Sequence, residues 1–157
     1  MATVTAKEPA ALKTGGHVRR ILFVCTGNTC RSPMAAAILA RSHPAWEVSS
    51  AGLAADGSPI AENARLVLHE NGIFSADGHN AQAVTSRMIE DADDVIGITS
   101  RHAMALTMRF PAAAGKIRPM PVDIPDPFGG DAETYRRCFA ALDCGIAALF
   151  GEAPHEV

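Results

Sequence analysis

A short apolar segment that leads directly into a helix start limits the folds open to this chain. Residues 19–25 (RRILFVC) are too short for a helix and end at a loop that contains Gly27 and Asn28, the pattern of a buried strand. Residues 32–42 (SPMAAAILARS) are predicted to form a helix, with Ser32 suited to the N-cap and Pro33 to the first helical position. A buried strand followed at once by a helix is typical of a parallel α/β sheet.

The same alternation of strand and helix signals continues along the chain. Strands are predicted over 46–50, 94–99 and 116–122, and helices over 60–71, 101–110 and 131–150. Gly72 and Pro111 stand where two of these helices are expected to end. Such alternation predicts a parallel sheet that is covered on both faces, with ligands bound at the carboxyl ends of its strands. Cys25 lies at that end of the first strand.

Length and charge restrict the classes of protein that fit. The 157 residues suit one domain, assigned to residues 18–157, after a mobile N-terminal extension over residues 1–17. The formal net charge of −3 argues against a nucleic-acid partner. No apolar run approaches the roughly 18 residues that cross a membrane, and the N-terminus lacks the apolar core of a signal peptide. We therefore expect a cytoplasmic protein with no membrane partner.

The four cysteines are expected to be reactive or buried thiols rather than disulfide partners, because nothing in the sequence directs the chain to an oxidising compartment. They are Cys25, Cys30, Cys138 and Cys144. Their spacing lacks the short Cys-x2-Cys pairs of zinc sites, and no clustered carboxylates suggest another metal. We expect neither a metal nor a cofactor.

The segment from Cys25 to Pro33 (CTGNTCRSP) has the composition of a phosphate-binding loop. Backbone N–H groups in a tight loop before a helix converge on one point, and the helix dipole adds positive potential there. Arg31 can hold two phosphoryl oxygens with its guanidinium, and the same environment favours the thiolate of Cys25. Ser32 can donate a hydrogen bond to that thiolate. The alternative is an inert buried Cys25 beside a surface Arg31. The residues predicted to bind phosphate are Thr26, Gly27, Asn28, Thr29, Cys30, Arg31 and Ser32.

With this loop and the later segment 125–130 (PDPFGG), the chain resembles the low-molecular-weight protein tyrosine phosphatase family. The resemblance extends from about Arg19 to about Phe150. It implies a three-layer sandwich in which helices flank a central four-stranded parallel sheet on both faces. It also implies Cys25 as the nucleophile, Arg31 as the phosphate clamp and Asp126 as the general acid.

The resemblance assigns supporting roles to residues outside the three reacting groups. Asn28 and Ser32 would hold the loop in shape, Ser50 would buttress Asn28, and His79 would belong to the same network. Phe128 follows the acid in its loop. Cys30 matches a second loop cysteine that forms a reversible disulfide with the nucleophile and shields it from deeper oxidation. The remaining histidines have no motif support and are expected to be solvated: His17, His43, His69, His102 and His155.

The expected chemistry is a double displacement through a phosphocysteine, with a phosphorylated protein as substrate and inorganic phosphate as product. Asp126 would protonate the leaving group and then activate water, and Asp123 is the nearest competing carboxylate. An alternative for Asp126 is a simple turn residue, since Pro-Asp-Pro is good turn chemistry. The protein is expected to be a monomer or weak dimer.

The sequence leaves two classes of substrate open, phosphoarginine and phosphotyrosine. Thr29 stands where tyrosine-specific members usually carry a branched apolar residue, and the two motifs together are similar to the protein arginine phosphatase branch. We slightly favour phosphoarginine over phosphotyrosine. An arsenate reductase on the same fold needs a further redox cysteine pair, and Cys138 and Cys144, six apart on a helix, point to different faces. A binding module without catalysis would lack one of the three reacting groups.

Overall fold

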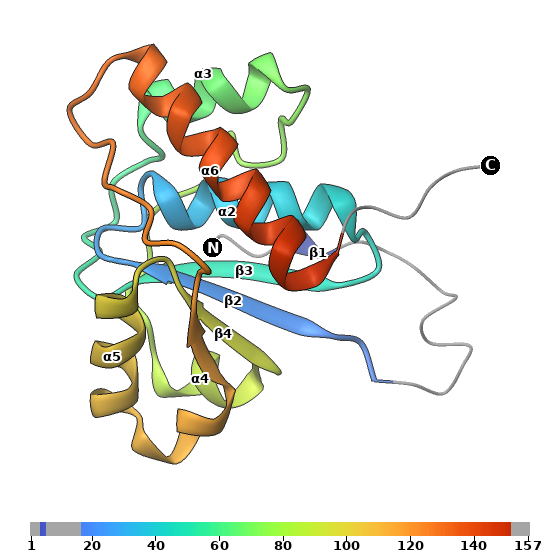
Figure 1. The fold of residues 1–157 in the computed structure, drawn as a ribbon, viewed down its shortest axis with the longest axis vertical. Helices are drawn as coiled ribbons and strands as arrows, with labels where there is room; N and C mark the ends of the chain where they lie inside the picture. The colour runs from blue at the N-terminus through green and yellow to red at the C-terminus, as the bar shows by residue number, and fades with distance from the viewer. Residues whose placement is uncertain (1–3, 6–16, 152–157) are drawn as a thin grey trace.

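The computed structural model describes residues 4–5 and 17–151 (Figure 1). Its strands are β1 (Val4–Thr5), β2 (Arg20–Cys25), β3 (Glu47–Gly52), β4 (Asp94–Gly97) and β5 (Ile117–Pro119). Its helices are α2 (Arg31–Ser42), α3 (Glu62–Glu70), α4 (Ser86–Asp91), α5 (Ser100–Arg109), the 3-10 helix Pro111–Lys116 and α6 (Ala132–Phe150). No helix in these ranges is long and apolar enough to cross a membrane.

The five strands form one sheet in the order β1-β3-β2-β4-β5. Strands β2 to β5 are parallel, which confirms the predicted four-stranded parallel sheet. The fifth strand was not predicted: Val4 and Thr5 pair antiparallel with Val48 and Glu47 of β3. Residues 1–3 and 6–16 of the expected extension lie outside the described residues, so its mobility stays a prediction.

Helices cover both faces of the sheet, as the sandwich prediction requires. Figure 1 shows α2, α3 and α6 above the sheet and α4 and α5 below it. The side chains of β2 alternate between two apolar clusters, with Ile21 and Phe23 in one and Leu22 and Val24 in the other. All four are at most 1% exposed, because a central parallel strand is buried on both faces. This burial fixes Cys25 at the end of β2.

Several element boundaries differ from the predictions. Helix α2 begins at Arg31, and its N-cap residue Cys30 has no side-chain cap, so the N-cap assignment of Ser32 is wrong. The six-residue helix α4 was not predicted, because so short a segment carries almost no periodicity. Strands β4 and β5 end at Gly97 and Pro119, before the predicted positions 99 and 122.

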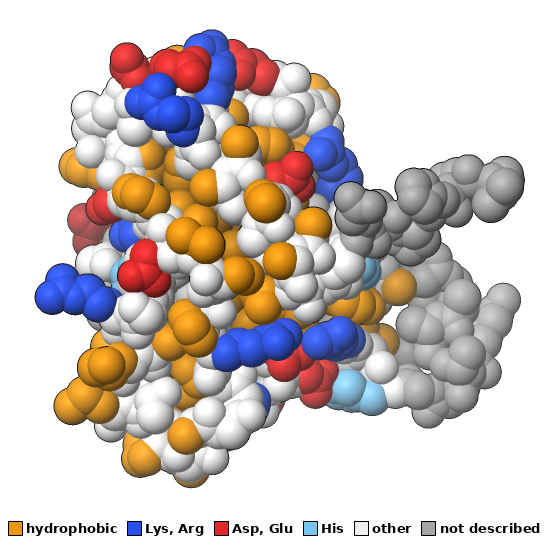
Figure 2. All heavy atoms as spheres, viewed as in Figure 1, with side chains coloured by type: hydrophobic (Ala, Val, Ile, Leu, Met, Phe, Trp, Pro, Cys, Tyr) orange, Lys and Arg blue, Asp and Glu red, His pale blue; other side chains and the backbone are white. Residues whose placement is uncertain are grey.

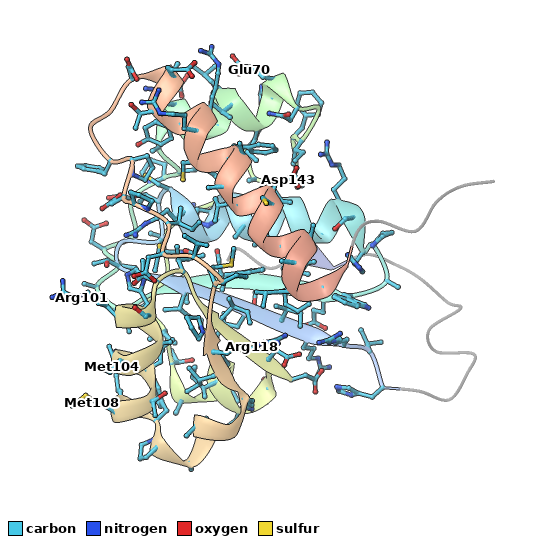
Figure 3. All side chains as sticks on the ribbon, viewed as in Figure 1. Glu70, Arg101, Met104, Met108, Arg118 and Asp143 are labelled. Atoms are coloured by element: carbon cyan, nitrogen blue, oxygen red, sulfur yellow. The ribbon has the colours of Figure 1, made fainter. Side chains whose placement is uncertain are left out.

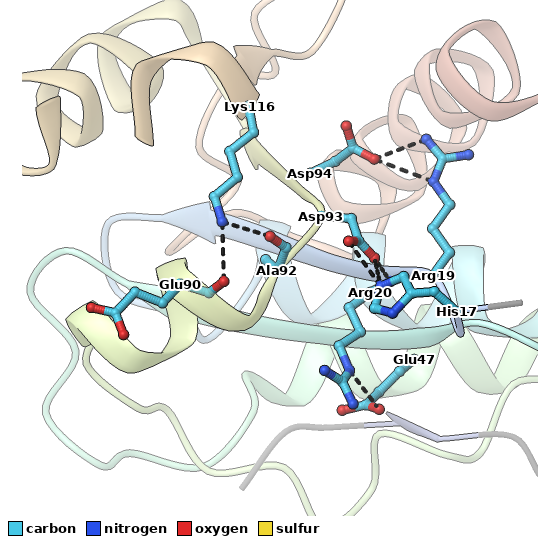
Figure 4. Close-up of polar contacts among 9 residues, drawn as sticks. All are labelled: His17, Arg19, Arg20, Glu47, Glu90, Ala92, Asp93, Asp94 and Lys116. Carbon is cyan, nitrogen blue, oxygen red and sulfur yellow. Dashed lines mark hydrogen bonds and ion pairs between the residues drawn. The ribbon is translucent and has the colours of Figure 1, made fainter. Parts of the chain in front are cut away.

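Charged side chains gather at the amino ends of the central strands, opposite Cys25 (Figure 4). Arg19 pairs with Asp94 at 2.8 Å and Arg20 with Glu47 at 3.3 Å, while the Arg20 N–H donates to Asp93. Figure 2 shows acidic and basic side chains intermixed at another end of the molecule, over α3 and α6. Exposed pairs of this kind each contribute only about 0–1 kcal/mol. The pairs at the amino ends of the strands connect β2 to β3 and β4. They lie at the end of the sheet opposite to Cys25.

Candidate active site

A pocket of about 360 Å³ opens at the carboxyl end of β2. The loop between β2 and α2 forms its floor, and two other segments, 54–61 and 126–128, contribute to its walls. The lining residues are Cys25, Thr26, Gly27, Asn28, Thr29, Cys30, Arg31, Ala54, Asp56, Ser58, Pro59, Ala61, Asp126 and Phe128. The two sequence motifs, about 100 residues apart in the chain, therefore meet at one pocket, where the parallel topology predicts a ligand.

The Cys25 thiol lies at the base of this loop and is 2% exposed. Its Sγ atom is 2.9 Å from Ser32 Oγ, and the Asn28 backbone N–H points at it from 3.3 Å. Both groups can donate hydrogen bonds to a thiolate, which stabilises the anionic form of the sulfur. Ser32 thus lies where it can donate to the thiolate, as predicted, but it is not the N-cap of α2.

Asn28 is the fixed point of the loop. It has a φ of 59°, a left-handed conformation that Asn tolerates better than most residues, and it is fully buried. Its Nδ2 donates to Ser32 Oγ at 2.8 Å and Ser50 Oγ at 3.0 Å, while its Oδ1 accepts from the Gln82 N–H. Its carbonyl accepts a 2.7 Å hydrogen bond from His79 Nε2. The structure thus brings Ser50 and His79 to Asn28, together with Gln82, which carried no sequence signal.

The end of β3 holds the phosphate loop from a second side. Leu53 N–H donates to the Cys25 carbonyl and Ala54 N–H to the Thr26 carbonyl, both at 2.9 Å. Gly52 makes this approach feasible, since a Cβ there would stand 2.5 Å from the Thr26 oxygen. The loop backbone is therefore fixed before any ligand arrives.

Arg31 joins the phosphate loop to the acid loop. Its side chain is almost buried, and Nη1 donates to the Ile124 carbonyl at 3.0 Å. Its Nη2 lies 3.7 Å from Asp126 Oδ2. The Asp126 side chain is 56% exposed, and its Oδ1 accepts the Phe128 N–H at 3.1 Å. One guanidinium therefore faces both the position of a bound phosphoryl group and the carboxylate proposed as its acid.

The other carboxylates near the acid loop have separate positions. Asp123 accepts from the Ser100 N–H at 2.7 Å and the Ser100 hydroxyl at 3.1 Å, at the start of α5. It does not line the pocket, whereas Asp126 does. Asp56, which sequence reasoning missed, also lines the pocket, and its Oδ1 accepts from the Ser58 N–H and hydroxyl. These hydrogen bonds lower the pKa of Asp56. Nothing in its loop sequence marked it as part of the site.

The prediction that the remaining histidines are solvated is wrong for His102. This side chain is 6% exposed and contacts Thr26 in the phosphate loop, with Nε2 at 2.9 Å from Oγ1. Burial and, second, the charge of Arg31 lower the pKa of His102 to about 4. His17 is exposed, His43 and His69 are partly exposed, and His155 lies outside the described residues. The only local pattern that includes His102 is Thr99-x-x-His102 at the start of α5, which resembles a capping box. That pattern predicts a contact with Thr99 but not the contact with Thr26.

The second loop cysteine is buried beside α6. Cys30 Sγ lies 3.2 Å from the Tyr135 hydroxyl, and burial raises the pKa of Cys30. Burial also raises the pKa of Cys138 to about 12, and this residue is buried while Cys144 is exposed. The two α6 cysteines therefore do lie on different faces of the helix. Thr29, half-buried, lines the pocket with its Oγ1 3.7 Å from Cys30 Sγ.

A buried cysteine in a rigid loop before a helix, facing an arginine and an acid loop, defines the class of cysteine-dependent phosphatases. The model of the family described as low molecular weight phosphotyrosine protein phosphatase matches residues 20–157. The chain belongs to this family and is a low-molecular-weight protein phosphatase.

Individual relatives extend the comparison. The chain is 46% identical to the protein-arginine-phosphatase of Geobacillus stearothermophilus, over 83% of this chain and 93% of that protein. It is 32% identical to the low molecular weight protein-tyrosine-phosphatase Wzb of Escherichia coli strain K12, over 78% and 87%. The solved YwlE arginine phosphatase from G. stearothermophilus superposes with a TM-score of 0.78 and 42% identity, covering 83% of this chain and 90% of that one.

Proposed function

We propose that this phosphatase removes phosphoryl groups from phosphoarginine in proteins, through a phosphocysteine on Cys25. The observation that carries the substrate assignment is the 46% identity to a protein-arginine-phosphatase, against 32% to a protein-tyrosine-phosphatase. Thr29 at the pocket wall supports the same choice.

In the first step the Cys25 thiolate attacks phosphorus in line, so that an S–P bond forms while the N–P bond of phosphoarginine breaks. Loop N–H groups and the Arg31 guanidinium stabilise the phosphoryl oxygens. Those oxygens would replace Asp126 as partner of Arg31, which leaves the carboxyl free to give its proton to the departing guanidino nitrogen. The products of this step are a protein arginine and phosphocysteine.

In the second step a water molecule attacks the phosphocysteine, and the S–P bond breaks to release inorganic phosphate. Asp126, now a carboxylate, accepts the proton of that water. The Ser32 hydroxyl and the Asn28 N–H stabilise the sulfur as it leaves as a thiolate. Every group that this cycle requires lines the pocket or contacts Cys25 directly.

Three pocket residues give the substrate preference a physical basis. Thr29 presents a small polar side chain where a larger apolar one would favour a phenol ring. The carbonyl oxygen of the Asp126 carboxyl can accept a hydrogen bond from a guanidinium N–H of the substrate, which places its proton near the nitrogen that leaves. Phe128 is 73% exposed at the pocket and can stack on that guanidinium.

Phosphotyrosine is the second candidate substrate, and the 32% identity to tyrosine phosphatases favours it. The mechanism is unchanged, except that Asp126 protonates a phenolate oxygen. A phenol ring can also stack on Phe128, so this side chain does not separate the two candidates.

The test is kcat/KM on matched phosphoarginine and phosphotyrosine peptides, with Cys25→Ser as the blank. We expect the wild type to prefer phosphoarginine, and Thr29→Ile to shift the preference towards phosphotyrosine by at least about 10-fold. Thr29→Val is the matched control, since it removes the hydroxyl without adding bulk. A wild-type preference for phosphotyrosine would overturn the substrate assignment. No Cys25-dependent turnover of either peptide would overturn the assignment of the site.

We also propose that Cys30 protects the nucleophile. Hydrogen peroxide would oxidise the Cys25 thiolate to a sulfenic acid, and the Cys30 thiol would condense with it to give a disulfide and water. The burial that raises the pKa of Cys30 keeps this residue a thiol and leaves Cys25 as the nucleophile. Peroxide inactivation that dithiothreitol reverses in the wild type, but not in Cys30→Ala, is the expected result; equal recovery would contradict it.

Finally, we propose a cytoplasmic monomer or weak dimer. Light scattering on the purified chain tests the oligomeric state, and a stable larger assembly would contradict it. Fractionation of the source cells tests the location.

A further inference from the structure

His102 is a buried histidine that the phosphatase mechanism does not use. It lies in the first turn of α5, on the side of that helix opposite its solvent-exposed face. Figure 3 shows Met104 and Met108 projecting from the outer side of α5, and they are 65% and 78% exposed. His102 is 6% exposed and directed at the phosphate loop. It is not a lining residue of the pocket, whereas Thr26 is.

The fold brings these two residues together at the ends of adjacent strands. Strand β2 leads into Thr26 and strand β4 leads into α5, and Val24 is paired in register with Gly97. Gly97 permits the first turn of α5 to pack against its own strand, because a Cβ there would be 2.5 Å from the Ala103 nitrogen. Any side chain at position 97 would push α5, and with it His102, away from the loop.

The hydrogen bonds of His102 define where its ring proton lies. The Thr99 backbone N–H donates to Nδ1 at 3.2 Å, so Nδ1 is an acceptor and carries no proton. In the neutral ring the proton is therefore on Nε2, which donates to Thr26 Oγ1 at 2.9 Å. This contact leaves the hydroxyl proton of Thr26 free for another acceptor.

We propose that His102 is a positioning residue of the phosphate site, acting through Thr26. The residue after the nucleophile is then held at both ends: its carbonyl by the Ala54 N–H and its side chain by His102. With the Thr26 oxygen occupied as an acceptor, its hydroxyl proton faces the pocket as a donor for an oxyanion. His102 thus preorganises the loop for a phosphoryl group without touching it. The proposal rests on the phosphatase site proposed above.

Two substitutions separate this role from the capping of α5. Asn at position 102 can place an oxygen near the position of Nδ1, and so keep an acceptor for the Thr99 N–H, but it is too short to reach Thr26. Gln can place an amide N–H near the position of Nε2 and restore the contact with Thr26. A role confined to the capping of α5 would be preserved by Asn, so only a role through Thr26 predicts a loss in His102→Asn that His102→Gln restores.

The experiment is calorimetric titration of the full chain with inorganic phosphate at 25 °C, where circular dichroism confirms that each variant is folded. We expect His102→Asn and Thr26→Val each to weaken phosphate binding by about 3- to 10-fold, and the double variant to lose no more than either single one. His102→Gln and Thr26→Ser should recover most of the affinity. His69→Asn, a histidine away from the pocket, is the matched control and should bind like the wild type.

Each other outcome counts against the proposal. Unchanged affinity in His102→Asn, additive losses in the double variant, or equal losses in His102→Asn and His102→Gln would overturn the role through Thr26. Because phosphate binding needs no turnover, a wild type that binds phosphate but hydrolyses neither peptide would contradict the proposed function alone. A wild type that does not bind phosphate would overturn both.

Discussion

The phosphate loop and the acid loop meet in one pocket but are built in opposite ways. Asn28 in the phosphate loop is fully buried, and other segments satisfy its side-chain donors and acceptor. Asp126 in the acid loop is 56% exposed, and among the described residues its carboxylate contacts only the Phe128 N–H of its own turn and, at 3.7 Å, Arg31. The phosphate loop is therefore a rigid receptor. The acid loop is stiffened by its two prolines and is held at its ends by hydrogen bonds from Arg31 to the Ile124 carbonyl and from Asn63 to the Gly130 carbonyl.

This difference separates the two contributions to catalysis. Preorganised donors around the phosphoryl group require a network that also stabilises the fold, so changes there should affect stability and binding together. An exposed acid contributes to chemistry and little to folding. The following predictions test that division, beginning with the largest expected effect.

Asp126→Ala should leave stability within about 0.5 kcal/mol of the wild type, because the side chain is largely exposed. It should reduce kcat on phosphopeptides by about 100- to 10,000-fold, the usual contribution of a general acid. Activated aryl phosphates, whose leaving groups need no proton, should be affected much less. Steady-state kinetics on both substrate types measure this, and equal slowing on both would remove Asp126 from the acid role.

Asn28→Ala should destabilise the protein by about 3–5 kcal/mol, because it leaves buried partners unpaired and places Ala at a positive φ. For a domain of this size the melting temperature should fall by roughly 10 °C. Phosphate affinity should fall with it. Asn63→Ala is the matched control: it removes one hydrogen bond to the Gly130 carbonyl beside the acid loop and should cost about 1 kcal/mol or less. Similar losses in both variants would contradict the contrast between the loops.

Acid should destabilise the protein through two histidines that contact the phosphate loop. Burial lowers the pKa of both His79 and His102 from the ordinary 6.5. Below pH 6.5 the unfolded chain therefore binds more protons than the folded one, so this stability is complete above pH 6.5 and lost as pH falls. As pH falls from 6.5 towards the folded pKa of each histidine, the free energy of unfolding should drop by up to about 1.4 kcal/mol per pH unit for that histidine. Urea unfolding at pH 7.5, 6.5 and 5.5 measures this slope, which His102→Asn should reduce; a flat profile would refute the prediction.

Phe128→Ala should have the smallest effect. The ring is 73% exposed, so its removal should change stability by no more than about 0.5 kcal/mol. The loss of stacking should raise KM for a phosphoarginine peptide by about 2- to 5-fold with little change in kcat. The same assay on small aryl phosphates serves as the control, and a large loss of stability would show that the acid loop is structural after all.

The strands, helices and loops that could be predicted are those whose signals lie close together in the sequence. The segment from β2 through the loop to α2 carries its strand, turn and helix signals within about 24 residues, so its architecture and its role as a ligand site could be predicted together. The acid loop lies about 100 residues later in the chain, and its role could be predicted only from the resemblance to a known family. Strand β1 could not be predicted, because two residues carry no pattern and are defined by pairing with β3.

The missed parts of the site are contacts between segments far apart in the chain. Gln82 joins the loop through its backbone N–H, which any sequence supplies. The sequence predicts a solvated His102, because its burial depends on the approach of α5 to Thr26, which no local pattern encodes. Ser before Pro predicts a helix N-cap at Ser32. In the structure its hydroxyl instead forms hydrogen bonds with Cys25 and Asn28, and these contacts between side chains could not be predicted from the local pattern.

The central claim is that Cys25 accepts a phosphoryl group from phosphoarginine. The most direct measurement is rapid mixing of the enzyme with a phosphoarginine peptide, followed by quenching and peptide mass analysis. The account predicts one added phosphoryl group on the enzyme fragment that contains Cys25, formed at the rate of arginine release. This adduct should be absent when the phosphoarginine substrate is mixed with the Cys25→Ala variant. Turnover without any adduct on Cys25, or an adduct that forms only from a phosphotyrosine peptide, would contradict it.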